Sequence, residues 1–320
     1  MQKRGLLLGT GLTVTLGLGS ALSYGISKGL VQMALHRDLS PLGKRLRLSG
    51  KRTAMDEKKE EILSHYAKKL SGAGCEAVAI TGRDGVRLVG HWYPCDAPKR
   101  VIVAMHGWRS AWDRDFGKIA EFWHKEGCSI LFAEQRGQNN SGGEYMTFGY
   151  LERFDCLAWL RWAERTVTGE LPLYAAGISM GASTVLMAAG LPLPRRVRGI
   201  IADCGFTSAE AIWRHVVQNN LRLSYDWHRP MIRRLCKKTL HADMGTVTTQ
   251  GALRQATVPV LFIHGSEDTF VPIEMTYENY KACASPKELL VVPDAGHGQS
   301  YYREPKKYEA ALKRFWCLYD

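Results

Sequence analysis

The sequence Gly177-Ile178-Ser179-Met180-Gly181 follows the pattern G-x-S-x-G, which is typical of a nucleophile elbow, a sharp turn between a strand and a helix. The apolar residues 171–176 before it predict a short buried strand, and the small residues 182–189 after it predict a helix. Glycine is required on both sides of the serine because a Cβ there would clash with the neighbouring strand or helix. We therefore expect the Ser179 hydroxyl to be exposed at the turn as a candidate nucleophile.

Asp268 and His297, which follow Ser179 in the sequence, are candidates for the acid and the base that a serine nucleophile requires. A serine hydroxyl reacts poorly until an imidazole accepts its proton, and the imidazole works best when a carboxylate fixes its tautomer. Asp268 lies in the loop after the strand predicted at 258–265, and His297 lies in a glycine-flanked loop after the strand predicted at 288–292. We therefore predict a catalytic triad of Ser179, Asp268 and His297.

Asp203 is a second candidate for the acid of the triad, because it ends the strand before the one that leads to Asp268. We favour Asp268, since the tight turn that contains it should direct its carboxylate toward the loop of His297. Asp203 instead leads into residues 206–256, and we expect Asp203 or Thr207 to cap the first helix of that segment.

A candidate oxyanion hole precedes the triad in the chain. The strand predicted at 101–105 ends in His106-Gly107, and the next backbone N–H, that of Trp108, is placed to act together with the N–H of Met180. Two such donors are enough to stabilise the negative oxygen of a tetrahedral intermediate. We expect the His106 side chain to be a structural, hydrogen-bonding group of this loop rather than a second catalytic base.

A set of motifs spread in order along the chain carries a resemblance to a known superfamily. The motifs are Met105-His106-Gly107-Trp108, residues 134–143, Gly177 to Gly181, residues 203–208, residues 262–268 and residues 295–298. Through them the chain from about Cys75 to its C-terminus resembles the α/β-hydrolase superfamily, and within it the serine-aminopeptidase-like hydrolases, membrane-associated bacterial esterases and depalmitoylating hydrolases. The resemblance implies the α/β-hydrolase fold with its triad order of serine, aspartate and histidine.

The alternation of strand and helix patterns predicts the fold class and the domain organisation. Alternation implies βαβ units, and so an α/β fold whose mostly parallel central sheet has helices on both faces. We expect residues 75–320 to form one hydrolase domain, in which residues 206–256 are too many for one crossover helix and form a small helical lid. Residues 1–35 are expected to be a hydrophobic anchor or signal segment, and residues 36–74 a basic linker or helical region.

The N-terminal segment predicts attachment to a membrane. Residues 5–27 carry no charge, and 23 residues are enough to cross a hydrocarbon layer of about 30 Å. We prefer an uncleaved membrane anchor, with a cleaved secretory signal as the alternative. The side of the membrane stays open, because Lys3 and Arg4 on one flank and the basic residues of 28–47 on the other favour opposite orientations.

The charge, the cysteine pattern and the motifs of the chain indicate which kinds of ligand it could bind. The formal net charge of +12 would draw an anchored domain toward anionic lipid headgroups, and no recognition module for nucleic acid is present. The eight cysteines are dispersed without a C-x-x-C pair, so we expect buried thiols rather than a disulfide framework. No zinc-type spacing and no GxxxxGK motif occurs, so the sequence predicts no metal and no cofactor.

Together these features predict a serine-dependent, carboxylesterase-like hydrolase. Ser179 would attack the carbonyl of a carboxylic ester or thioester, and water would release the acyl group from the enzyme. The expected substrate is a small-molecule or lipid-like acyl ester, whose acyl chain length the sequence leaves open. Two alternatives remain, namely a peptidase or amidase of the serine-aminopeptidase-like group, and a membrane-tethered, non-catalytic binding protein on a hydrolase scaffold.

Overall fold

A single sheet organises the molecule. The computed structural model describes residues 21–39 and 54–320, and within them eight strands pair in the order β1-β2-β4-β3-β5-β6-β7-β8. The two pairs that β2 makes, with β1 and with β4, are antiparallel, and every other pair is parallel. The strands are β1 (Glu76–Thr81), β2 (Arg87–Tyr93), β3 (Arg100–Met105), β4 (Cys128–Ala133), β5 (Leu173–Ile178), β6 (Val197–Asp203), β7 (Val260–Gly265) and β8 (Lys287–Val292). The predicted α/β fold class is therefore confirmed.

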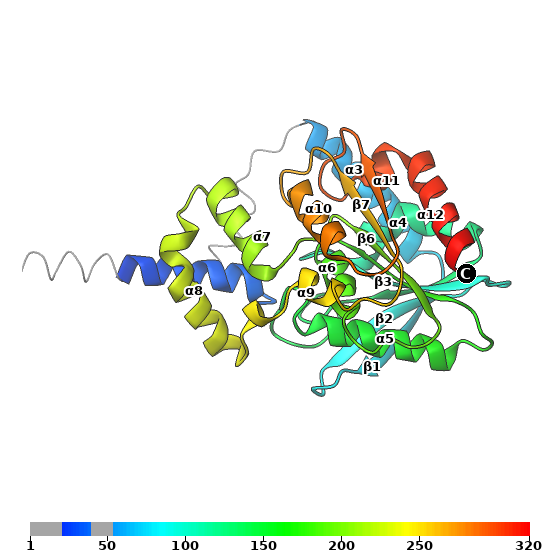
Figure 1. Ribbon diagram of the computed structural model, residues 1–320, viewed down its shortest axis with the longest axis horizontal. Coiled ribbons are helices and arrows are strands. Elements are labelled where there is room, and N and C mark those ends of the chain that lie inside the picture. The colour runs from blue at the N-terminus through cyan, green and yellow to red at the C-terminus, as the bar shows by residue number, and fades with distance from the viewer. Residues whose placement is uncertain (1–20, 40–53) are drawn as a thin grey trace, which may run out of the picture.

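Helices cover both faces of this sheet, because its central strands are apolar on both sides (Figure 1). Successive side chains of β3 point to opposite faces of the sheet and pack into two different hydrophobic cores. Val101 and Val103 belong to the first core, and Ile102 and Ala104 belong to the second. The first core is closed by α5 (Glu152–Thr166), α6 (Met180–Ala188), α9 (Thr249–Leu253) and α10 (Ile273–Ala282). The second is closed by α3 (Ala54–Ser71), α4 (Trp112–Lys125), α11 (Ser300–Arg303) and α12 (Pro305–Tyr319).

Helical structure fills the segment between β6 and β7. It comprises α7 (Ala209–His215), a π-helical turn η1 (Val216–Asn220), α8 (Tyr225–Leu240) and a 3₁₀ turn η2 (Met244–Thr246), followed by α9. We call α7, η1 and α8 the lid. The prediction that Asp203 or Thr207 caps the first lid helix is wrong, because the Ser208 hydroxyl accepts the hydrogen bond from the backbone N–H of Ala211.

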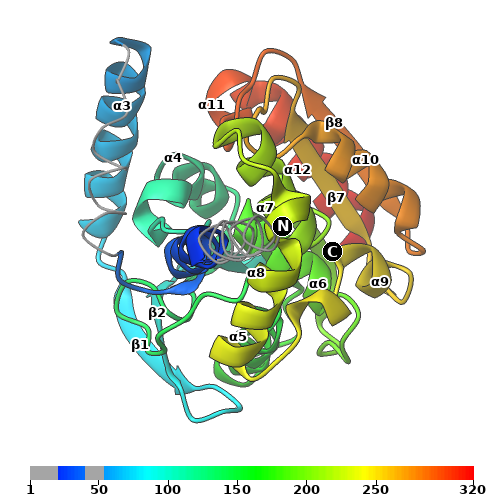
Figure 2. The ribbon, with the colours of Figure 1, turned by 90° about the vertical axis from the view of Figure 1, so that its left-hand side faces the viewer.

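A helix near the start of the chain lies against the lid. Residues 21–35 are helical, and we call this segment the N-terminal helix. Figure 1 shows it beside α8, and Figure 2 shows it end-on between the lid and α4. Its buried residues Val31 and Leu35 belong to a third apolar cluster, which they share with Phe206 and Trp213.

The membrane-anchor prediction gains no support from this part of the chain. Most of residues 5–27, on which it rests, lie outside the described residues. Among residues 21–39 and 54–320, no helix has the length and apolar character that a membrane span requires. The eight cysteines all lie in the described part, where none forms a disulfide and Cys317 is exposed rather than buried.

Candidate active site

Ser179 stands at the turn between β5 and α6 with a strained backbone, at φ 56° and ψ −117°. Close packing at this turn allows only glycine on either side. A Cβ at Gly177 would lie 2.3 Å from the backbone of Gly181, and a Cβ at Gly181 would lie 1.8 Å from the carbonyl oxygen of Met105. The strain therefore persists because the surrounding backbone fixes it, as in a nucleophile elbow. Ser179 is only 6% exposed, so the prediction that its hydroxyl is exposed at the turn is wrong.

The structure brings the three predicted triad residues together. His297 Nε2 lies 2.9 Å from Ser179 Oγ, and His297 Nδ1 lies 2.7 Å from Asp268 Oδ2. The other carboxylate oxygen, Oδ1 of Asp268, accepts hydrogen bonds of 2.9 Å from the backbone N–H groups of Phe270 and Val271. These contacts form one continuous chain of hydrogen bonds from the serine hydroxyl to a carboxylate whose two oxygens are both engaged.

Asp268 is built to stay ionised. Its side chain is buried, which acts to raise its pKa, but hydrogen bonds from His264 and His297 and the charge of His297 outweigh burial. The net result is a pKa well below the ordinary value for aspartate. A permanently charged Asp268 favours the His297 tautomer with its proton on Nδ1, which leaves Nε2 free to accept the serine proton.

The alternative acid, Asp203, lies in a different environment. Its Oδ1 accepts a hydrogen bond of 3.0 Å from the Ser300 hydroxyl, and a second bond comes from Tyr308. Burial raises the pKa of Asp203 to about 6. Its backbone carbonyl accepts the N–H of Ser179 at 2.9 Å, so Asp203 supports the elbow through its main chain.

The two predicted oxyanion donors lie at the ends of neighbouring strands. Met180 is the first residue of α6, where a backbone N–H has no acceptor within the helix. Trp108 follows Gly107, whose position is so close to the nucleophile that a Cβ there would lie 3.5 Å from Ser179 Cβ. The N–H of Gly107 is itself engaged, at 2.7 Å, by a carboxylate oxygen of Asp115, which fixes this loop.

His106 acts as a structural residue of the same loop. Its Nδ1 lies 2.8 Å from the Gly107 carbonyl, and its Nε2 accepts the backbone N–H of Gln135 at 3.1 Å. An Nε2 that accepts requires a neutral ring, and complete burial lowers the pKa of His106 in the same direction. This agrees with the role expected from the sequence.

An apolar pocket adjoins the triad. It encloses about 620 Å³ of empty space, including the part that is open to solvent. Its lining residues are Leu30, Met33, Ala34, Trp108, Phe148, Ile212, Trp213, Val216, Val217, Leu221, Ile232 and Phe270. We call this the apolar pocket. The sequence reasoning missed its N-terminal side, although Ser27, Val31 and Leu35 recur at the four-residue spacing of a buried helix stripe.

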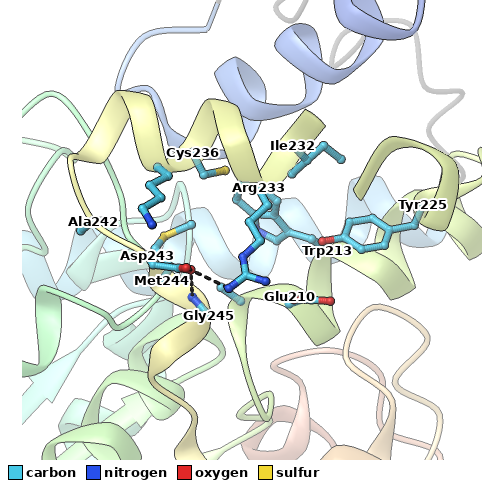
Figure 3. A pocket seen from close by; sticks show the side chains of 12 residues that line it. Glu210, Trp213, Tyr225, Ile232, Arg233, Cys236, Ala242, Asp243, Met244 and Gly245 are labelled. Atoms are coloured by element: carbon cyan, nitrogen blue, oxygen red, sulfur yellow. Dashed lines mark hydrogen bonds and ion pairs between the residues drawn. The ribbon is translucent and has the colours of Figure 1, made fainter. Parts of the chain in front are cut away.

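A second hollow lies on the lid, away from the triad (Figure 3). Arg233 reaches across it toward Asp243, whose Oδ2 accepts a hydrogen bond from the guanidinium at 2.9 Å. Trp213 and Ile232 line both this hollow and the apolar pocket. The lining of the lid hollow contains no triad residue, and it contains neither Trp108 nor Phe270, the residues of the apolar pocket that neighbour the triad.

One group of metal-ligating side chains overlaps with the triad. Among the described residues, donor atoms of Cys204, Asp268 and His297 lie within 4.8 Å of one another. Two of the three atoms belong to the hydrogen-bonded triad, and burial raises the pKa of the Cys204 thiol well above its ordinary value. The hydrogen bonds that join Asp268 to His297 and His297 to Ser179 account for the proximity of these side chains.

Comparisons with known proteins give matches in sequence and in fold. Residues 114–319 match the prolyl oligopeptidase family. The uncharacterized protein YqkD of Bacillus subtilis is 24% identical over 225 residues, which are 70% of this chain and 73% of YqkD. The uncharacterized protein Rv2307c of Mycobacterium tuberculosis is 28% identical over 258 residues, which are 78% of this chain and 81% of Rv2307c. The solved structure of the Pyrococcus furiosus esterase Pf2001 superposes with a TM-score of 0.64 at 23% identity, covering 79% of this chain and 93% of the esterase.

Proposed function

Because the chain belongs to the prolyl oligopeptidase family and has an α/β-hydrolase fold, we propose that it hydrolyses carboxylic esters or thioesters through an acyl-enzyme on Ser179. The family and the fold identify a serine-type α/β-hydrolase, and the ester chemistry and the residue roles are our proposal. The observation that carries it is the continuous chain of hydrogen bonds from Ser179 through His297 to Asp268.

Acylation follows from the positions of these groups. His297 Nε2, 2.9 Å from the hydroxyl, takes the Ser179 proton as Oγ attacks the carbonyl carbon. The carbonyl oxygen becomes negative, and the N–H groups of Trp108 and Met180 stabilise it. When the tetrahedral intermediate collapses, the bond to the leaving alcohol or thiol breaks and that group takes the proton from Nε2.

Deacylation repeats these steps with water as the nucleophile. His297 removes a proton from water, the resulting hydroxide attacks the acyl carbon, and Ser179 leaves with the proton returned to its oxygen. Asp268 stays ionised throughout and stabilises the imidazolium that forms in each half of the reaction.

The surroundings of the triad favour an acyl ester over a peptide. A peptide would bring backbone N–H and C=O groups into the apolar pocket, where burial without hydrogen bonds costs about 1–3 kcal/mol for each group. An aliphatic acyl chain carries no such groups. The family description favours a peptidase as the second candidate, so amide substrates belong in the test.

The experiment combines active-site labelling with a substrate panel. A fluorophosphonate should label the wild-type protein and its Ser71→Ala variant. The Ser71 hydroxyl, which this control variant lacks, donates a hydrogen bond to the Lys68 carbonyl. The fluorophosphonate should not label Ser179→Ala, and ester turnover of that variant should fall by roughly 10³ to 10⁶. Labelling that persists in Ser179→Ala would refute the assigned nucleophile. Turnover of aminoacyl amides without turnover of esters or thioesters would establish the peptidase alternative instead.

A further inference from the structure

The apolar pocket and the N-terminal helix form one structural unit with the candidate active site. We propose that the apolar pocket binds the acyl chain of the substrate, and that the N-terminal helix, through Leu30 and Met33, sets which acyl chains it accepts. This inference rests on the proposed ester or thioester hydrolase function and adds to it a substrate class, aliphatic acyl groups, together with the pocket wall that selects among them.

Two residues of the pocket lining, Trp108 and Phe270, lie next to the groups that react. The backbone N–H of Trp108 is a proposed oxyanion donor, and the same residue lines the pocket. Phe270 lies two residues after Asp268, and the centroid of its ring is 4.9 Å from that of His297. An ester carbonyl seated against Ser179 therefore has its acyl substituent at the mouth of this pocket.

The chemistry of the lining identifies the class of ligand. All twelve lining residues are apolar or aromatic, and none has a charged side chain. A sugar or peptide in this space would lose hydrogen bonds to water without replacing them, whereas each methylene of an aliphatic chain gains from leaving water.

The N-terminal helix is held in place by the oxyanion loop itself. The Trp108 indole donates a hydrogen bond of 3.0 Å to the Ala34 carbonyl. Next to it, the Arg109 guanidinium donates to the carbonyls of Arg37, at 2.9 Å, and Met33, at 2.8 Å. Carbonyls at a helix C-terminus lack partners within the helix and favour a nearby cation, so these two side chains satisfy and fix that end.

The other side of the helix is fixed to the lid and the core. Leu35 is fully buried and Val31 nearly so, in the apolar cluster that also contains Met180. Ser27 is buried as well, and its hydroxyl lies 3.2 Å from Nδ1 of His228 in α8. Because its C-terminal end and its packed side are both held, the helix presents Leu30 and Met33 to the pocket as a fixed wall.

The test uses the full chain and two matched substitutions on one helix. Leu30→Trp adds bulk to the pocket wall, whereas Leu22→Trp makes the same change at a side chain that is 67% exposed and lines no part of the pocket. For the wild type, kcat/KM should rise by about fourfold for each methylene added between acetyl and hexanoyl p-nitrophenyl esters. Leu30→Trp should flatten this series and lower octanoyl turnover at least tenfold, with acetyl turnover, fluorophosphonate labelling and melting temperature close to wild type.

The outcomes separate the two proposals. Equal losses for acetyl and octanoyl esters in Leu30→Trp would mean that the helix acts on the fold and not on chain selection. A chain-length series unchanged from wild type would mean that the acyl group binds elsewhere, and either result overturns the pocket assignment while leaving ester hydrolysis intact. Failure of the wild-type protein to hydrolyse any ester or thioester would instead refute the proposed function. Met33→Ala supplies the opposite change and should shift the preferred chain to a longer one.

Discussion

Nδ1 of His297 lies 2.7 Å from Oδ2 of Asp268, whereas Asp203, at the end of the neighbouring strand, is bonded to the Ser300 hydroxyl instead. The distances thus distinguish between two carboxylates that the sequence left as alternatives. Only Asp268 is in a position to orient the imidazole.

The first prediction compares these two acids. Asp268→Asn should lower kcat by about 10⁴, because an amide favours the wrong imidazole tautomer and does not stabilise the imidazolium. Asp203→Asn should keep kcat within about a few-fold of wild type, since the Asp203 side chain bonds to Ser300 and Tyr308 and its contact with Ser179 is made by the main chain. Steady-state kinetics on one ester, with circular dichroism as a folding control, distinguishes them. Loss of turnover in a folded Asp203→Asn protein would reassign the acid of the triad.

The second prediction concerns the pH dependence of stability. Burial raises the pKa of Asp203 to about 6, above its ordinary value of 3.8, so the folded state binds this proton more tightly than the unfolded state. Wild-type stability should therefore fall, relative to Asp203→Asn, as pH rises through this window, by up to about 3 kcal/mol. Melting temperatures of both proteins between pH 4 and 7 test this. The prediction is contradicted if the difference in melting temperature between the two proteins does not change with pH, or if wild type becomes relatively more stable as pH rises.

The third prediction concerns the elbow glycine Gly181. A Cβ at this position would lie 1.8 Å from the Met105 carbonyl oxygen, so Gly181→Ala should prevent correct folding around the turn and yield little soluble protein. Gly29 is the control, because a Cβ there meets nothing within 4 Å and the residue is helical. Gly29→Ala should be neutral or stabilising by about 1 kcal/mol. Expression yield and melting temperature are the measurements, and a folded, active Gly181→Ala protein would contradict the packing described.

The fourth prediction concerns Arg109, which holds the end of the N-terminal helix. Arg109→Ala should release that end and lower octanoyl ester turnover more than acetyl ester turnover, with faster proteolysis within residues 21–39. Arg195→Ala removes an equal charge at an exposed position and should change neither quantity. Chain-length kinetics and limited proteolysis with mass spectrometry measure both effects. Equal proteolysis of the two variants would show that the guanidinium does not retain the helix.

The convergence of Ser179, Asp268 and His297 in space could be predicted because each of them follows a strand, and strand patterns are local. Asp268 and His297 each follow an apolar run that pairs in the parallel sheet, so their convergence follows from topology. The strand before Ser179 begins and ends two residues later than predicted, at Leu173–Ile178. Glycine at 177 indicated a turn, yet Gly177 and Ile178 still pair with β6, which brings the strand to the serine itself.

The N-terminal side of the site was not predictable in the same way. From the sequence we assign residues 21–35 to a hydrophobic anchor or signal segment, and the spacing of Ser27, Val31 and Leu35 is the available signal for a packed helix. The contacts that fix this helix join its backbone carbonyls to Trp108 and Arg109, more than seventy residues away. Backbone acceptors are identical in every residue type, so no sequence pattern marks them.

The use of backbone carbonyls has a consequence for engineering. The hydrogen bonds from Trp108 and Arg109 to the N-terminal helix go to the backbone carbonyls of Ala34 and Met33. The helix is therefore attached at this end through its main chain, whereas the proposed chain-length selectivity depends on its side chains. The pocket-facing positions can then be randomised as a library while the attachment persists. Transfer of the helix to a related hydrolase would require that the recipient carry the same Trp-Arg pair after its third strand, together with packing partners for Ser27, Val31 and Leu35.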